Sequence, residues 1–255
     1  MKISLIQTSL VWEDHKANRA NFKNLIGTIK GSTDLIVLPE MFATGFTMDP
    51  APVAETMDGE TINWMKTIAA QRDCAITGSL VIKEDGNYYN RLLFVTPDGT
   101  VQHYNKRHLF SLAGEDKAYT KGKEKLIVDF RGWKICLQVC YDLRFPVFSR
   151  NVEEYDLLVY VANWPSPRLL AWDTLLRARA IENMCYVAGV NRVGQDKNGH
   201  SYPGHSQVLD GLGAHVKEPS GDEVVFTVEI DKESLYAMRG KFAFLNDRDS
   251  FTLLS

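Results

Sequence analysis

The sequence has few cysteines, and they do not follow a metal-binding spacing. Of its four cysteines, Cys136 and Cys140 are the closest pair, and they form CxxxC and not CxxC. Paired cysteines or histidines at short, regular spacing are the usual sign of a zinc site. We therefore expect no metal, and we expect free thiols in the reducing environment of the cytoplasm.

The chain also lacks a strong charge imbalance and a long apolar run. Its 255 residues carry a formal net charge of −3 at pH 7, with 45% hydrophobic and 24% charged residues. This balance provides no electrostatic basis for binding nucleic acid or an anionic membrane surface. No apolar run approaches the ~20 residues of a membrane span, and we expect no secretory signal at the N-terminus.

No linker, repeat or low-complexity segment divides the sequence, so we expect residues 1–255 to form one domain. Helices and hairpins alternate in two groups, which favours an α/β fold with four layers, an α-β-β-α sandwich. A doubly wound parallel sheet is the second possibility, but it would show fewer hairpins. The patterns predict helices at 14–30, 60–72 and 169–183, and strands at 3–8, 34–39, 74–81, 87–96, 100–106, 126–130, 133–139, 157–162, 184–191, 206–209, 214–217 and 223–230.

One predicted strand ends at a cysteine. Apolar residues alternate from position 135 to 139, and the residues after Cys140 are polar and charged and lead to Pro146. A rigid strand would fix the sulfur, and the turn would present backbone N–H groups to developing negative charge. Considered alone, a cysteine in a core segment is more often a structural thiol.

Two other predicted strand ends carry charged side chains. Glu40 directly follows the apolar segment 34–39, and Lys106 closes the strand at 100–106. Considered singly, each is more often a solvated surface charge. Together they meet the needs of Cys140, because a carboxylate can take the thiol proton and a fixed ammonium can stabilise the thiolate and an oxyanion. The three side chains predict one acyl-transfer site.

Three motifs, in this order, resemble the Glu, Lys and Cys signatures of the nitrilase superfamily of carbon–nitrogen hydrolases. They are Leu-Pro-Glu40-Met-Phe, Tyr-Asn-Lys106-Arg-His-Leu-Phe and Gln-Val-Cys140-Tyr-Asp-Leu-Arg-Phe-Pro. The similarity covers nearly the whole chain. Within the superfamily, the segments ending at Phe46 and Pro165 resemble those of bacterial omega-amidases, which hydrolyse the terminal amide of 2-oxo dicarboxylic acid monoamides.

The resemblance implies a role for each residue of the site, and it implies no cofactor. Cys140 would form a thioester and release ammonia, with Glu40 as the general base. Lys106 and the backbone N–H of Tyr141 would form the oxyanion hole. Glu115 matches an accessory glutamate of the family that orients the lysine and the substrate.

The small-molecule substrate implied by the resemblance has a free carboxylate, which must be paired when it is buried. Arg144 is the usual partner in the family, and an arginine can bind a carboxylate through two hydrogen bonds. Arg168 is a second candidate, although it is equally well explained as a surface charge. Trp164 and Phe46 are expected as walls of the substrate site, and a homodimer or larger homo-oligomer is usual in the superfamily.

Other functions remain open at this point. Within the superfamily, the chain could be another aliphatic or carbamoyl amidase, whereas a true nitrilase is less well supported. A binding protein could keep the fold without the chemistry, but the presence of all three reactive residues argues against this. A thiol redox protein using Cys136 and Cys140 is disfavoured, since positions i and i+4 of a strand are about 13 Å apart.

Overall fold

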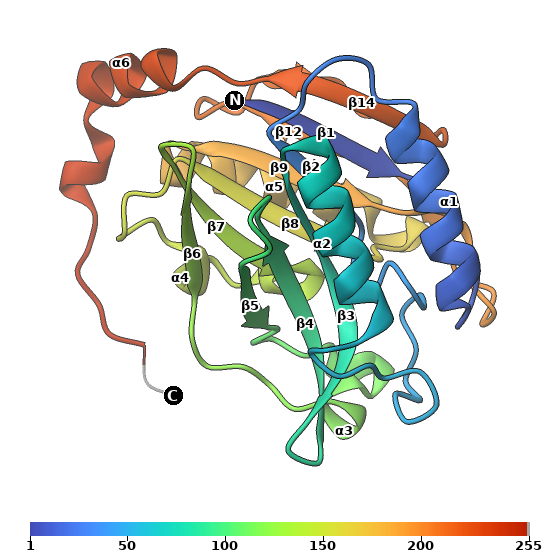
Figure 1. Cartoon of the computed structure of the whole chain (residues 1–255). Helices are drawn as coiled ribbons and strands as arrows, with labels where there is room; N and C mark the ends of the chain where they lie inside the picture. The colour runs from blue at the N-terminus through green and yellow to red at the C-terminus, as the bar shows by residue number, and fades with distance from the viewer. Residues whose placement is uncertain (254–255) are drawn as a thin grey trace.

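The strands assemble into two six-stranded sheets in the computed structural model, which describes residues 1–253 (Figure 1). In the first sheet, the order β14-β1-β2-β3-β4-β5 brings strands from both ends of the chain together. β2 pairs with β1 and β3 in parallel, and the other neighbours are antiparallel. The bounds are β1 (Lys2–Gln7), β2 (Leu35–Val37), β3 (Ala75–Glu84), β4 (Asn87–Val95), β5 (Val101–Asn105) and β14 (Val224–Glu229).

The second sheet has the order β13-β12-β9-β8-β7-β6. Its central strands β7, β8 and β9 are parallel, and antiparallel strands complete both edges. A separate two-stranded ribbon, β10 with β11, follows β9. The bounds are β6 (Leu126–Phe130), β7 (Trp133–Val139), β8 (Leu157–Ala162), β9 (Tyr186–Asn191), β10 (Val193–Gln195), β11 (Ser201–Pro203), β12 (Gln207–Leu209) and β13 (His215–Lys217).

Three apolar clusters separate the layers of the molecule. The largest lies between the sheets and contains inward-facing side chains of both, such as Leu5 and Phe94 from the first and Leu137 and Val159 from the second. The helices α1 (His15–Gly27) and α2 (Glu60–Arg72) cover the outer face of the first sheet, and α5 (Leu169–Asn183) covers that of the second. The predicted α-β-β-α sandwich is therefore confirmed.

The helix ends follow ordinary capping chemistry. α1 begins after Asp14, whose carboxylate accepts the Ala17 N–H at 2.9 Å, and it ends at Gly27, three residues before the predicted end. The predicted bounds of α2 and α5 are correct. Shorter elements that the periodicity did not predict are α3 (Glu115–Ala118), α4 (Pro146–Ser149) and the 3₁₀ turns η1 (Ser111–Ala113), η2 (Cys140–Arg144), η3 (Ser166–Arg168) and η4 (Phe244–Asp247).

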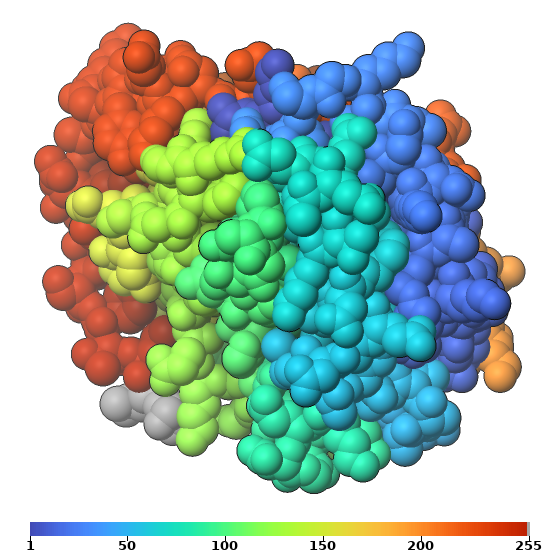
Figure 2. All heavy atoms as spheres, in the orientation of Figure 1, coloured from blue at the N-terminus to red at the C-terminus, as the bar shows by residue number. Residues whose placement is uncertain are grey.

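The C-terminal region contains a further helix that the sequence pattern did not predict. α6 (Lys232–Phe242) starts after Asp231, which caps it by accepting the N–H groups of Glu233 and Ser234. It follows β14, and the remaining described residues run along the side of the molecule, visible in red at the left of the space-filling view (Figure 2). Among residues 1–253, no helix is both long and apolar enough to cross a membrane.

Candidate active site

Segments that leave both sheets meet at one place, and the predicted reactive residues lie on them. Glu40 follows β2, Lys106 follows β5, and Cys140 is the first residue after β7. In sheets with parallel strands, sites form where the carboxyl ends of the strands meet, and β2 and β7 are such strands. Glu40 and Lys106 are fully buried, while Cys140 is half-buried.

Lys106 joins two buried glutamates into one ion-pair cluster. Its Nζ lies 2.8 Å from Oε1 of Glu40 and 2.9 Å from Oε2 of Glu115. Burial by itself lowers the pKa of Lys106, but the charges of Glu115 and Glu40 outweigh this effect and raise it, so the ammonium stays protonated. The structure therefore brings Glu115 to Lys106, as the resemblance implied.

In this cluster, the ionised form of Glu115 is disfavoured. Burial raises its pKa, the like charge of Glu40 adds to this, and the Lys106 ammonium opposes both. Its Oε2 also accepts the backbone N–H of Phe110 at 2.6 Å. The carboxylate is thus held by a backbone donor and a cation, which fixes its position beside the lysine.

The carboxylate of Glu40 is oriented by two asparagines that the sequence analysis did not single out. Asn90 of β4 donates to Oε1 at 2.8 Å, and the backbone N–H of Asn163 donates to Oε2 at 2.9 Å. The side-chain amide of Asn163 also donates to the backbone oxygen of Glu40 at 2.6 Å. Asn163 directly follows β8, so its place after a buried strand is the signal that could have found it.

Cys140 occupies a sharp turn between β7 and η2. Its φ of 45° lies in the left-handed region, which residues with a side chain rarely adopt. Burial raises the pKa of the thiol well above its ordinary value, the Glu40 carboxylate raises it further, and the Lys106 charge acts in the opposite direction. At neutral pH the sulfur is therefore a thiol beside a proton acceptor.

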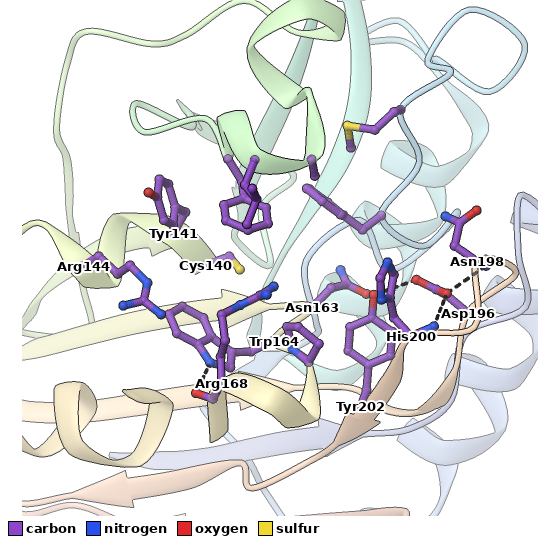
Figure 3. A pocket seen from close by; sticks show the side chains of 16 residues that line it. Cys140, Tyr141, Arg144, Asn163, Trp164, Arg168, Asp196, Asn198, His200 and Tyr202 are labelled. Carbon is purple, nitrogen blue, oxygen red and sulfur yellow. Dashed lines mark hydrogen bonds between the residues drawn. The ribbon is translucent and has the colours of Figure 1, made fainter. Parts of the chain in front are cut away.

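A cavity of about 290 Å³ opens over the sulfur (Figure 3). Six predicted residues line it, whereas Glu40, Lys106 and Glu115 lie buried behind its wall. In Figure 3, Cys140 lies between Arg144 on one side and the Asp196–Tyr202 segment on the other. The six are Phe46, Cys140, Tyr141, Arg144, Trp164 and Arg168.

Both predicted arginines stack on aromatic rings at the cavity. The guanidinium of Arg144 lies 5.1 Å from the ring centre of Trp164, and that of Arg168 lies 4.9 Å from the ring of Phe110. The indole N–H of Trp164 donates to the backbone oxygen of Arg168 at 2.7 Å, which ties the two segments together. Arg144 and Arg168 thus present two guanidinium groups to the cavity, and neither forms an ion pair with a carboxylate within residues 1–253.

The far wall of the cavity comes from the β10–β11 ribbon, which the sequence pattern did not predict. Asp196 fixes its loop by accepting the backbone N–H groups of Asn198 and His200, each at 2.9 Å, and the Tyr202 hydroxyl at 2.8 Å. All four residues line the cavity. Asn198-Gly199 is a typical hairpin turn and was the available signal. The flanking residues show no strand alternation, so the periodicity did not predict the ribbon.

The remaining thiols differ from Cys140 in their surroundings. All four cysteines are free, and Cys74, Cys136 and Cys185 are buried. Cys136 is fully buried and does not line the cavity, so a substrate in the cavity does not meet its sulfur, and burial raises the pKa of this thiol to about 12. Within residues 1–253, no three His, Cys, Asp or Glu side chains are grouped in a way that could hold a metal ion.

Comparison with known proteins gives matches over the whole chain. A family model described as carbon-nitrogen hydrolase matches residues 2–240. The protein named omega-amidase YafV from Yersinia enterocolitica is 48% identical over 255 residues, which cover 100% of this chain and 99% of that protein. The 2-oxoglutaramate amidase of Bacillus subtilis is 30% identical over 250 residues, covering 96% of each.

The backbone of this chain also matches that of a solved structure. XC1258 from Xanthomonas campestris, described as a CN-hydrolase superfamily protein with an arsenic adduct in its active site, is 48% identical to this chain. The TM-score is 0.97, and the match covers 99% of this chain and 98% of that one. The similarity therefore extends from the sequence motifs to the arrangement of the whole backbone.

Proposed function

Because the chain belongs to the carbon-nitrogen hydrolase family, we propose that it is an amidase that hydrolyses the terminal amide of 2-oxo dicarboxylic acid monoamides through Cys140. Its substrates are 2-oxoglutaramate and 2-oxosuccinamate, and its products are the dicarboxylic acid and ammonia. The observation that carries the proposal is the shared cavity of a cysteine and two arginines, with a buried glutamate–lysine pair behind it. The names of the Yersinia and Bacillus relatives agree with this substrate class.

The first half of the reaction makes a thioester. The sulfur of Cys140 bonds to the amide carbonyl carbon while Glu40 takes the thiol proton. When the tetrahedral intermediate collapses, the carbon–nitrogen bond breaks, and Glu40 passes the proton to the leaving nitrogen, which departs as ammonia. A raised thiol pKa suits this sequence, because proton transfer and attack then occur together and no free thiolate is exposed beforehand.

Negative charge develops on the carbonyl oxygen in each tetrahedral intermediate. We assign its stabilisation to the Lys106 ammonium and the backbone N–H of Tyr141. Glu115 and Glu40 keep the lysine charged and fix its position before the substrate arrives. Such a preorganised cation needs no rearrangement during the reaction, which is what makes it effective in a buried site.

The second half returns the enzyme to its starting state. Water attacks the thioester carbon while Glu40 takes one of its protons, and the carbon–sulfur bond then breaks. Glu40 returns that proton to the sulfur of Cys140. Substrate, water and these side chains supply every atom and proton of the reaction, so the proposal includes no cofactor.

The two arginines account for the proposed preference for an acidic substrate. The carboxylate at the far end of a monoamide pairs with Arg144, with Arg168 as a second cation beside it. Trp164 and Phe110 hold the guanidinium groups by stacking, and Phe46, whose ring centre lies 5.2 Å from Lys106 Nζ, forms the wall near the lysine. The carboxylate is thereby paired where it leaves bulk water.

An ammonia-release screen tests the proposal. We expect turnover of 2-oxoglutaramate and 2-oxosuccinamate well above that of glutamine, asparagine, carbamoyl amines and simple nitriles. A preference for a neutral aliphatic amide or for a carbamoyl amine would replace the substrate assignment with that of another amidase. Full amide hydrolysis by Cys140→Ala would overturn the enzyme mechanism and leave a non-catalytic binding role for the cavity.

We also propose a cytoplasmic location and a homodimer. Four free thiols suit a reducing compartment, and exposed apolar side chains on α4, α5 and the C-terminal region, among them Val147, Ile181 and Phe244, offer a surface for a second copy. Cell fractionation tests the location. Sedimentation of the purified protein tests the dimer, and a concentration-independent monomer would contradict it.

A further inference from the structure

Asp142 lies two residues after the nucleophile and is fully buried. Its Oδ2 accepts the backbone N–H of Val139 at 3.0 Å and the Tyr104 hydroxyl at 2.7 Å. Its Oδ1 accepts the backbone N–H of His108 at 3.0 Å and lies 2.8 Å from Nδ1 of the same histidine. Both carboxylate oxygens are therefore used, and none of these bonds is to a residue assigned a step in the reaction.

These bonds connect the two sheets at the site. Tyr104 and His108 stand on either side of Lys106, two residues away in each direction. Tyr104 lies in β5, and His108 lies on the segment that continues from it. Asp142 belongs to the turn after β7. The Tyr104 hydroxyl also accepts the backbone N–H of Arg107 at 3.0 Å, so the segment that carries the lysine is bound to the carboxylate both directly and through the phenol.

The turn that Asp142 occupies is conformationally unfavourable at Cys140, where φ is 45°. A residue with a side chain is strained in the left-handed region and persists there only where its surroundings hold it. The bond from Val139 to Asp142 closes the turn from one side of the cysteine. On the other side, Phe145 donates its N–H to the Asp142 backbone oxygen at 3.0 Å, and its ring stacks on His108 with centres 3.8 Å apart.

We propose that Asp142 is a positioning residue that holds the sulfur of Cys140 at its working distance from Lys106 and Glu40, by bonding the nucleophile turn to the lysine segment across the two sheets. Its charge makes the bonds strong, since hydrogen bonds to an ionised acceptor are about twice as strong as neutral ones. The inference rests on the proposed function for the roles of Cys140 and Lys106.

Asp142→Asn tests the inference, because it keeps the size of the side chain but puts an N–H₂ group where an oxygen now accepts two hydrogen bonds. We expect kcat to fall by about 10²-fold, as small misplacements of reacting groups do, while KM for the monoamide changes by less than about threefold. Alkylation of Cys140 by iodoacetamide, followed by mass spectrometry, should slow by about tenfold because the thiol no longer faces its proton acceptor.

Asp156→Asn is the matched control. Asp156 is also a fully buried aspartate and directly precedes β8. It accepts the Lys134 N–H and pairs with Lys232 and Arg239, away from the cavity. This variant should lose thermal stability but keep kcat and the alkylation rate within about twofold. If Asp142→Asn behaves in the same way, Asp142 is purely structural and the inference is overturned.

Tyr104→Phe keeps the inference testable if Asp142→Asn does not fold. It removes one donor to the carboxylate, so we expect kcat and the alkylation rate to fall by roughly two- to tenfold, the equivalent of one hydrogen bond. Unchanged rates in a folded Tyr104→Phe would overturn the inference. The alkylation assay needs no substrate, so it decides the role of Asp142 even if the monoamides prove not to be substrates.

Discussion

Burial and the Glu40 carboxylate raise the pKa of the Cys140 thiol, so its ionisation should depend on pH in a defined direction. Since its pKa is raised above the ordinary value of 9.0, the thiolate fraction increases throughout the neutral and alkaline range. We expect the ultraviolet absorbance of the Cys140 thiolate, taken as the difference between the protein and its Cys140→Ala variant, to be still rising above pH 9.0. A thiolate absorbance that is already complete at about pH 6 would indicate a stable thiolate–lysine ion pair and would contradict the direction of the pKa shift.

The role of Glu40 as general base can be tested with glutamine, which keeps the volume of the side chain but is not basic. Glu40→Gln should reduce turnover of the monoamide by about 10²- to 10⁴-fold, because an amide cannot accept the thiol proton as the carboxylate does. In this variant Lys106 still pairs with the carboxylate of Glu115, so we expect the fold to stay intact. Thermal unfolding must accompany the kinetic measurement, and retained activity in the folded variant would remove Glu40 as the base.

Arg144 can be tested by comparing two substrates. Arg144→Lys should raise KM strongly for an acidic 2-oxo monoamide and much less for a neutral short-chain amide, because a lysine cannot form the paired hydrogen bonds of a guanidinium. Arg177→Lys, an exposed arginine of α5, is the control and should change neither KM. An equal loss for both substrates would make Arg144 a structural residue.

The three residues proposed to react could be selected from the sequence, while the residues that contact them could not. Glu40, Lys106 and Cys140 each combine reactive chemistry with a place after a strand pattern, so position and residue type point to the same conclusion. Asn90 lies in the middle of β4 and has no charge, and its bond to Glu40 spans 50 positions of the chain. Such a contact depends on which strands become neighbours, and strand periodicity does not contain that information.

At the level of secondary-structure elements, β9 and α5 pack so closely at Gly189 that the space leaves no room for a side chain at this position. A Cβ added to Gly189 would lie 2.5 Å from Cδ1 of Leu176 and 2.9 Å from the ring of Trp172, both on α5. We expect Gly189→Ala to lower the free energy of unfolding by about 1–3 kcal/mol, as overpacking does. Urea unfolding measures this.

Gly27→Ala is the matched comparison, because Gly27 is the last residue of α1 and an added Cβ would have no atom within 4 Å beyond its chain neighbours and the backbone of its own helix. It should leave stability unchanged or raise it by up to about 1 kcal/mol. Equal effects of the two substitutions would show that the close approach of β9 and α5 is relieved by a small shift of the helix.

The long elements were predicted almost to their ends, and the short ones were missed for a physical reason. α2 and α5 each run for more than three turns, so apolar periodicity repeats often enough to be recognised. α6 buries only Leu235, and its start depends on the Asp231 cap. β3 extends to Glu84, beyond the predicted Val81, because pairing with β4 through the Asp85–Gly86 turn continues after the apolar residues end.

For the molecule as a whole, we propose that residues 1–255 form a single carbon–nitrogen hydrolase domain. Its main core contains side chains of both sheets, so neither sheet can bury its inner face alone. We expect circular dichroism and tryptophan fluorescence to report one coincident unfolding transition in urea. Two separate transitions would show that the sheets are independently stable and would contradict the single domain.

The pairing of β1 with β14 has a consequence for synthesis of the protein. Lys2 lies opposite Glu229, so the outer edge of β1 has no partner until nearly the whole chain has left the ribosome. At about 5–20 residues per second, this interval is on the order of 10 to 45 s. An open apolar edge is prone to pairing with other chains. The nascent protein therefore has a period of exposure to aggregation, which ends with emergence of its last strand.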